Sequence, residues 1–236
     1  MSKKYACLIP ARGNSKRFPR KNIALLKGKP VLGYVIEAAL SSKLFPDVWV
    51  STDDAEIASV VRQFGAKVHT RPPALAADNA TMMDVCLNFM DGLDKQGQSP
   101  EVFCLMLPTA ALVEAEDLTG AARLLDEKSA DMVMAVTSYL ESPFWALHES
   151  AGFLKTFFGQ EYLVASQKLP KVCVDSGYFY FAKTEALRRE KTWYSRKLVG
   201  FPIPRERSMD IDEPAHLIMA EALMDAQEKL PAEAAS

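Results

Sequence analysis

The sequence predicts an α/β fold whose doubly wound, mostly parallel sheet forms a single domain over residues 1–236. Three observations support this: the length, the composition, and the alternation of short apolar runs with amphipathic stretches. The chain has 236 residues, of which 49% are hydrophobic and 25% are charged, the balance of an ordinary globular protein. This length suits one large domain, and strands that alternate with helices build mostly parallel sheets.

The apolar pattern orders the elements along the chain. Short apolar runs predict strands, and these lie at 5–10, 47–52, 67–69, 101–107, 131–137, 178–182 and 198–202. Apolar residues at helical spacing predict helices, and these lie at 31–40, 54–64, 81–93, 116–127, 184–189 and 213–227. The regular succession of the two patterns is what predicts the doubly wound sheet.

The alternation breaks between about 140 and 170. Prolines, glycines and aromatic residues without helical period fill this stretch, which predicts an inserted hairpin or arm outside the sheet. Several apolar residues of the arm have no place in the sheet, namely Phe144, Trp145, Phe153, Leu154, Phe157 and Phe158. If they are exposed they form a sticky patch, and a symmetric homodimer would bury it. The alternative is that they fold back on the chain's own core.

Charge and cysteine usage narrow the classes of partner. The formal net charge is -2, which argues against a pervasive surface for nucleic acid or anionic membrane. No apolar run approaches the ~20 residues of a membrane helix, and the N-terminal apolar stretch is too short for a signal peptide. The four cysteines, which are typical of reduced and buried thiols, are Cys7, Cys86, Cys104 and Cys173. We therefore expect a cytoplasmic protein without nucleic-acid or membrane partners.

The strongest chemical signal is the segment directly after the first predicted strand, where five basic residues lie within ten positions. Open α/β sheets bind ligands outside the carboxyl ends of their strands. The small residues Gly13 and Ser15 let backbone N–H groups approach an anion. Arg12, Lys16 and Lys21 would then neutralise a polyphosphate; the alternative is a solvated basic loop. The spacing matches neither a P-loop nor a Rossmann turn.

Asp210 and Asp212 form the second constellation, just before the last predicted helix. In an extended backbone, carboxylates at positions i and i+2 point to the same side. Mg²⁺ takes one or two protein carboxylates and completes its shell with water and substrate phosphates. Beside a polyphosphate loop, the pair indicates nucleotide chemistry that depends on Mg²⁺ or Mn²⁺. The alternative is that Asp212 only caps the final helix.

Three weaker signals follow other predicted strands. Asp53 ends the second strand and could contact a ligand or cap the next helix. Arg71 stands in a rigid turn before two prolines, and Pro108 and Thr109 end a buried strand. The three histidines share no motif, so we expect surface or filler roles for them, and no Ser-His-Asp or Cys-His pattern is legible.

The run IPARGNSKRFPRKN at 9–22 closely resembles the signature of the acylneuraminate (CMP-sialic acid synthetase-like) cytidylyltransferase family. The similarity continues in chain order through 50–54, 71–72, 107–109, 116–118, 177–180 and 210–212. Arg17 and Ser176 stand where the sialic acid enzymes usually have glycine and asparagine. The residues at these two positions and over 166–169 are more similar to those of pseudaminic acid cytidylyltransferases.

The resemblance implies that CMP passes from CTP to the anomeric hydroxyl of a nonulosonic acid, with pyrophosphate leaving. Pseudaminic acid is the expected sugar, and sialic or legionaminic acid are the alternatives. The implied catalytic residues are Arg12, Lys21 and Asp212, and the implied metal ligands are Asp210 and Asp212. The implied nucleotide-binding residues are Arg12, Gly13, Asn14, Ser15, Lys16, Lys21, Asn22 and Arg71. The implied sugar-binding residues are Pro108, Thr109, Gln167 and Asp175. A homodimer is also implied.

Two other classes of function stay open. One is a sugar nucleotidyltransferase that uses a different nucleotide or sugar, and the continuation of the basic segment over 17–22 argues against it. The other is a non-catalytic nucleotide-binding module. The presence of both Asp210 and Asp212 beside the basic segment argues against that class.

Overall fold

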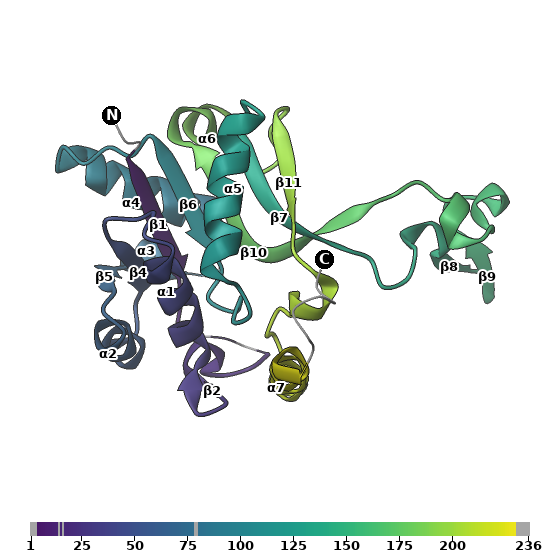
Figure 1. Cartoon of the computed structure of the whole chain (residues 1–236), viewed down its shortest axis with the longest axis horizontal. Helices are drawn as coiled ribbons and strands as arrows, with labels where there is room; N and C mark the ends of the chain where they lie inside the picture. The colour runs from purple at the N-terminus through teal and green to yellow at the C-terminus, as the bar shows by residue number, and fades with distance from the viewer. Residues whose placement is uncertain (1–3, 14, 16, 78–79, 230–236) are drawn as a thin grey trace.

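The computed structural model describes residues 4–13, 15, 17–77 and 80–229 (Figure 1). Its centre is a seven-stranded sheet in the order β11-β7-β10-β6-β1-β4-β5. The strands are β1 (Tyr5–Pro10), β4 (Val48–Thr52), β5 (Lys67–Thr70), β6 (Val102–Met106), β7 (Met132–Ser138), β10 (Cys173–Lys183) and β11 (Leu198–Pro202). Only β10 runs antiparallel to its neighbours, β6 and β7. The predicted mostly parallel sheet is therefore confirmed.

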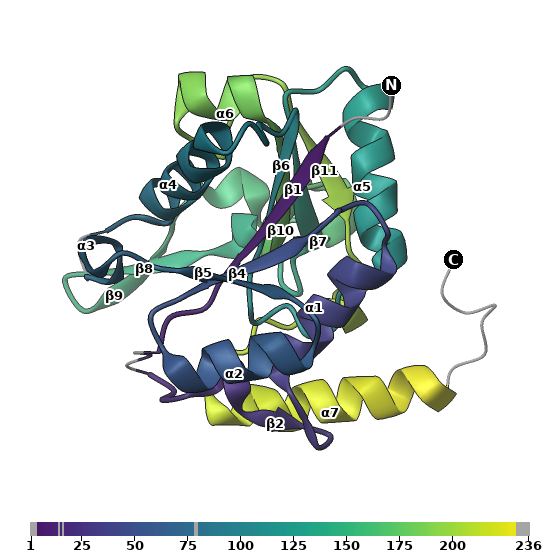
Figure 2. The ribbon, with the colours of Figure 1, turned by 90° about the vertical axis from the view of Figure 1, so that its left-hand side faces the viewer.

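Helices cover both faces of this sheet (Figure 2). They are α1 (Val31–Ser41), α2 (Ala55–Gln63), α3 (Pro73–Ala76), α4 (Met82–Lys95), α5 (Ala115–Glu127), α6 (Thr184–Glu190) and α7 (Pro214–Lys229). Helices α1, α2 and α5 pack on one face, and α4 and α6 pack on the other. This is the doubly wound arrangement that the sequence predicts, with α3 as a short addition. None of the helices in the described part of the chain is long and apolar enough to cross a membrane.

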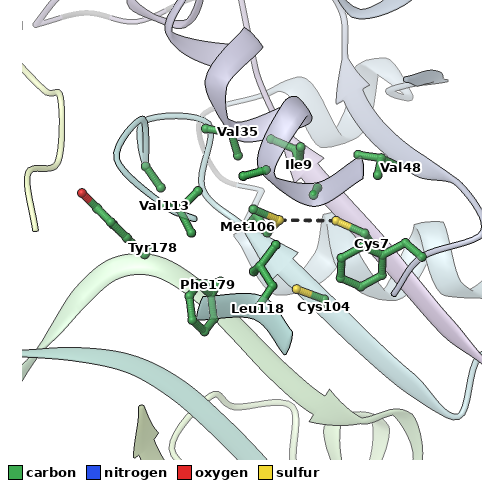
Figure 3. Packing of buried hydrophobic residues seen from close by; sticks show 14 of the residues in the cluster. Cys7, Ile9, Val35, Val48, Cys104, Met106, Val113, Leu118, Tyr178 and Phe179 are labelled. Atoms are coloured by element: carbon green, nitrogen blue, oxygen red, sulfur yellow. Dashed lines mark hydrogen bonds between the residues drawn. The ribbon is translucent and has the colours of Figure 1, made fainter. Parts of the chain in front are cut away.

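The central strands supply both halves of the core because successive side chains point to opposite faces. In β1, Cys7 and Ile9 join the cluster under α1 and α5, whereas Ala6 and Leu8 join the cluster under α4. Figure 3 shows the first cluster, in which the Cys7 and Met106 sulfurs lie 3.6 Å apart. Strands buried on both faces read as continuous apolar runs, and this made them recognisable in the sequence.

The cysteine prediction is confirmed for three residues and wrong for one. Cys7, Cys86 and Cys104 are buried free thiols, but Cys173 is exposed. Cys173 begins β10 at the point where the chain returns from outside the sheet.

The inserted segment, residues 139–172, leaves the body between β7 and β10 and projects far from it (Figure 1). Its strands β8 (Leu147–Ser150) and β9 (Phe153–Thr156) form an antiparallel hairpin. The predicted hairpin outside the sheet is therefore confirmed. Phe144 stacks on Tyr162 with ring centroids 4.9 Å apart, but Phe153 remains 74% exposed. The alternative that these residues all fold back on the core is wrong.

A short hairpin that the sequence did not predict joins the basic segment to α1. It consists of β2 (Leu25–Leu26) and β3 (Lys29–Pro30). Leu26 is fully buried in a cluster with Ile211 and with Ala220 of α7. This packing brings the chain before α7 against the chain after β1, although some 190 residues separate them.

Candidate active site

A cavity of about 500 Å³ lies beyond the carboxyl ends of β1, β5 and β6. Open α/β sheets place their ligands at this edge. The cavity is lined by Pro10, Arg12, Ser15, Arg17, Phe18, Lys21, Asn22, Arg71, Met82, Leu107, Pro108, Thr109, Asp210 and Asp212. Residues from the two ends of the chain therefore share one cavity, as the two constellations in the sequence predict.

Most of the predicted site residues meet in this cavity. They are Arg12, Ser15, Lys21, Asn22, Arg71, Pro108, Thr109, Asp210 and Asp212. Gly13 and Asp175 lie behind its wall, whereas Gln167 lies in a 3-10 turn of the inserted segment and is exposed. Asn14 and Lys16 fall outside the described residues, so their predicted role stays a prediction.

Gly13 holds the basic segment against the end of β4. Its N–H donates to Asp53 Oδ1 at 3.2 Å, and a Cβ there would lie 2.6 Å from Asp54 Oδ2. Asp54 Oδ1 accepts the N–H groups of Glu56 and Ile57 at the start of α2. The helix cap is therefore Asp54, and the capping role predicted for Asp53 is wrong. Asp53, which lies one residue nearer to β4, instead fixes the basic segment through its bond with Gly13.

Asn22 sits at the floor of the cavity and is almost completely buried. Its Nδ2 donates to the backbone carbonyl of Arg12 at 3.0 Å, which joins the two ends of the basic segment. Its buried Oδ1 has no hydrogen-bond partner in the described part of the chain. A buried polar group without a partner costs free energy, so this oxygen can still take a hydrogen-bond donor.

Arg71 is a buried cation in the cavity wall. Its Nε and Nη2 donate to Ser51 Oγ and to the Ser51 carbonyl, at 3.2 and 3.0 Å. Burial lowers the pKa of Arg71, and the nearby Asp53 carboxylate opposes that change. The same Ser51 hydroxyl lies 3.1 Å from His69 Nδ1, and burial followed by the charge of Arg71 lowers the pKa of His69. His69 thus supports the cavity wall through Ser51, which is more than the surface or filler role that the sequence predicts.

Asp212 is held by two cations of the basic segment. Lys21 Nζ lies 2.7 Å from Oδ1, and Arg17 Nη2 lies 2.5 Å from Oδ2. Burial raises the pKa of Asp212, but the hydrogen bond and charge of Lys21, together with Arg17, outweigh burial and lower it. The backbone N–H of Asp212 donates to His216 Nδ1, so His216 also has a defined contact. The carboxylate lines the cavity and pairs with the basic segment, so Asp212 makes contacts beyond those of a helix cap.

Asp210 differs from Asp212 because its buried Oδ1 has no hydrogen-bond partner in the described part of the chain. Its other oxygen lies behind Gly177, where a Cβ would come within 3.8 Å of it. Gly177 has a φ of +69°, and the register of β10 shifts between Asp175 and Tyr180. Asp175 stabilises this irregular turn by accepting the Gly177 N–H and the Tyr180 hydroxyl, at 2.9 and 2.7 Å.

The two aspartates fit a divalent cation. An unpaired buried carboxylate oxygen, with a second carboxylate two residues away, is a hard oxygen donor set of the kind that Mg²⁺ prefers. No group of three or more His, Cys, Asp or Glu side chains that could hold a metal ion occurs among the described residues. A metal bound here would therefore complete its shell with water and with substrate oxygens.

Several lining residues were missed in the sequence. Arg17 and Phe18 belong to the basic segment, so its charge density was a usable signal for both. Pro10 and Leu107 stand at the ends of buried strands at the same edge of the sheet, so their place in the sequence was also a usable signal. Met82 begins α4 and lines the cavity, but nothing in its local sequence distinguishes it from a core methionine.

Known proteins of similar sequence and fold indicate the family of this chain. Residues 6–175 match the cytidylyltransferase family. The chain is 34% identical to the pseudaminic acid cytidylyltransferase of Campylobacter jejuni subsp. jejuni serotype O:2, over 93% of this chain and 96% of that protein. It is also 34% identical to the N-acylneuraminate cytidylyltransferase A of Danio rerio, over 89% of this chain and 48% of that protein.

The fold is shared with more distant proteins. A solved CMP:2-keto-3-deoxy-manno-octonic acid synthetase complexed with CTP superimposes with a TM-score of 0.68 at 20% identity, over 95% of this chain and 99% of the other. A 4-diphosphocytidyl-2C-methyl-D-erythritol synthase from Anaerococcus prevotii gives 0.65 at 11% identity, over 95% of this chain and 100% of that one. With the match over residues 6–175 and these relatives, the chain belongs to the cytidylyltransferase family.

Proposed function

We propose that this protein transfers CMP from CTP to the anomeric hydroxyl of a nonulosonic acid and releases pyrophosphate, and that the sugar is pseudaminic acid. One observation carries the proposal: the basic segment and the Asp210–Asp212 pair line a single cavity at the carboxyl end of the sheet. The names of the similar proteins support the sugar class, because they act on pseudaminic or N-acylneuraminic acid. Sialic and legionaminic acid are the alternatives.

The reaction needs little covalent work from the protein. The sugar hydroxyl attacks the α-phosphorus of CTP, and catalysis depends on positioning and on neutralising charge. Lys21 and Arg17 lie on the Asp212 carboxylate without a ligand, and Arg12 lines the same cavity. A triphosphate with about four negative charges can recruit all three cations. Asn22 Oδ1 would accept a hydrogen bond from the nucleotide, and Ser15 and Arg71 would complete the nucleotide contacts.

Asp210 and Asp212 would hold a Mg²⁺ or Mn²⁺ ion. When bound, such an ion neutralises phosphate charge and stabilises the pyrophosphate leaving group. Asp210 lines the cavity, and its buried Oδ1 has no hydrogen-bond partner among the described residues. Asp212 becomes available as Lys21 and Arg17 turn to the phosphates.

The sugar would lie over Pro108 and Thr109, which line the cavity next to Asp210. Asp175 supports this region from behind, through the Gly177 turn. Gln167 lies on the projecting inserted segment, so its predicted sugar contact requires a second subunit. We propose a homodimer formed through that segment, located in the cytoplasm, with no nucleic-acid or membrane partner.

The test is pyrophosphate release with CTP and pseudaminic, legionaminic or N-acetylneuraminic acid, with magnesium and with excess chelator. We expect magnesium-dependent release that is fastest with pseudaminic acid. Faster release with another acid reassigns the sugar, and a preference for another nucleoside triphosphate reassigns the nucleotide. CTP binding without release for every acid would favour the non-catalytic binding module.

A further inference from the structure

The two aspartates lie in a segment that has no regular structure. A 3-10 turn, Arg205–Arg207, follows β11, and α7 begins only at Pro214. Between them, residues 208–213 belong to neither a helix nor a strand. Neighbouring backbone hydrogen bonds of a sheet or helix therefore do not fix the carboxylates. A metal site needs its ligands oriented, so other contacts must hold this segment.

Tyr178 on β10 makes the first of these contacts. The residue is fully buried, and its hydroxyl points away from the core cluster (Figure 3). That hydroxyl donates to the carbonyl of Arg207 and accepts the N–H of Met209 at 2.9 Å. Burial raises the pKa of Tyr178, so the phenol keeps its proton and can serve both bonds. One side chain thus binds the backbone on both sides of Ser208, next to Asp210.

Arg207 makes the second contact. Its side chain is only 13% exposed, and its two terminal nitrogens donate to the two oxygens of Asp117, at 2.7 and 2.8 Å. Such a bidentate pair fixes direction as well as distance. Asp117 is itself fixed in the first turn of α5, where Oδ2 accepts the Glu114 N–H at 2.9 Å. The segment is therefore tied to a helix that packs on the sheet.

Neither contact reaches the cavity, since Tyr178, Arg207 and Asp117 are absent from its lining. Losing one partner of a buried ion pair is costly, and removing the phenol hydroxyl leaves the Met209 N–H without its acceptor. Both contacts converge on the two residues that flank Ser208. We propose that Tyr178 and the Arg207–Asp117 pair are positioning residues that orient the Asp210 carboxylate at the cavity wall. This inference rests on the proposed function of Asp210 as a metal ligand and adds what orients that ligand.

The test compares Tyr178→Phe and Arg207→Lys with Asp210→Asn. Phenylalanine keeps the buried ring and loses only the hydroxyl, whereas lysine keeps the charge and loses the two-point geometry. The matched control is Arg188→Lys, because Arg188 also forms two ion pairs, with Asp91 and Asp94 at 2.6 Å, but links α6 to α4 far from the cavity. Mn²⁺ binding in the presence of CTP is followed by electron paramagnetic resonance. Turnover is measured across a magnesium titration, and thermal unfolding is recorded for each variant.

We expect Tyr178→Phe and Arg207→Lys to weaken Mn²⁺ binding by about 10-fold, the usual effect of losing a group that orients a metal ligand. The magnesium concentration for half-maximal turnover should rise by a similar factor, with the KM for CTP at saturating magnesium nearly unchanged. Arg188→Lys should leave metal binding unchanged. A purely structural role predicts a lower unfolding temperature with normal Mn²⁺ binding by the folded protein.

Normal Mn²⁺ binding by folded Tyr178→Phe would overturn the inference, and this variant decides alone if Arg207→Lys does not fold. Full turnover and normal Mn²⁺ binding by Asp210→Asn would instead overturn the proposed role of Asp210 as a metal ligand, whatever the positioning variants do. The two failures are therefore distinguishable.

Discussion

The candidate active-site cavity and the inserted segment both lie at the carboxyl end of the sheet, but they expose opposite chemistry. In the cavity, charged side chains form ion pairs with one another; Lys21 and Arg17, for example, both pair with Asp212. In the inserted segment, apolar side chains project without cover, with Phe153 and Leu154 exposed by 74% and 70%. The first region is suited to a charged small ligand, and the second is suited to another protein surface. Changes in the two regions should therefore have separable effects.

The largest effect is expected in the cavity. Asp210→Asn and Asp212→Asn should each lower kcat by about 100-fold or more, because the amide keeps the shape but loses the charge that metal and phosphate binding require. Asp210→Asn should leave the unfolding temperature almost unchanged, since its Oδ1 has no partner to lose. Turnover across a magnesium titration and in excess chelator, with thermal unfolding alongside, measures both effects. Full activity of both variants, or full activity in chelator, would end the metal hypothesis.

The next effect concerns CTP affinity. Arg12→Ala and Lys21→Ala should each weaken CTP binding by about 1.5–3 kcal/mol, the contribution of a hydrogen bond to a charged group. Isothermal titration calorimetry measures this directly. Arg123→Ala on α5 is the matched control, since Arg123 is an exposed arginine that pairs with Glu127 outside the cavity. Unchanged CTP affinity in both Arg12→Ala and Lys21→Ala would show that the basic segment does not bind CTP.

A change in the inserted segment should alter assembly and leave the body folded. We expect the protein to be a dimer at micromolar concentration and the double variant Phe153→Ser with Phe157→Ser to be a monomer. Both side chains are mostly exposed, so the unfolding temperature of the monomeric body should hardly depend on them. Light scattering measures the mass of each form. A monodisperse wild-type monomer would contradict the proposed dimer.

The smallest effect is a pH dependence beneath the cavity wall. Burial and then Arg71 lower the pKa of His69, so the unfolded chain binds a proton there more readily than the folded one. Stability should therefore fall as the pH drops below about 6.5, the ordinary histidine value. His69→Gln should flatten part of that slope between about pH 7.5 and about pH 5.5. An identical slope in wild type and variant, from thermal unfolding, would exclude His69 as its source.

Much of this molecule could be predicted because its signals are local. Buried parallel strands appear as apolar runs, and five positive charges on one segment predict an anion site. The antiparallel direction of β10 could not be predicted, because an apolar strand reads the same in both directions. The contact between Arg17 and Asp212 spans 195 residues and depends on how the β2–β3 hairpin packs near α7. The observed helix cap, Asp54, is one residue away from the predicted cap, Asp53. The apolar pattern does not locate a helix end to within one residue.

The point where the inserted segment leaves the sheet has a further consequence. Ser138 at the end of β7 pairs with Cys173 at the start of β10, and paired residues in antiparallel strands lie only about 5 Å apart. The inserted segment therefore begins and ends at nearly the same place. A two-residue turn could connect β7 directly to β10. During evolution, this part of the chain can be lengthened, exchanged or deleted without a shift in strand register. Quaternary structure can then diverge among descendants while the chemistry at the sheet edge is retained.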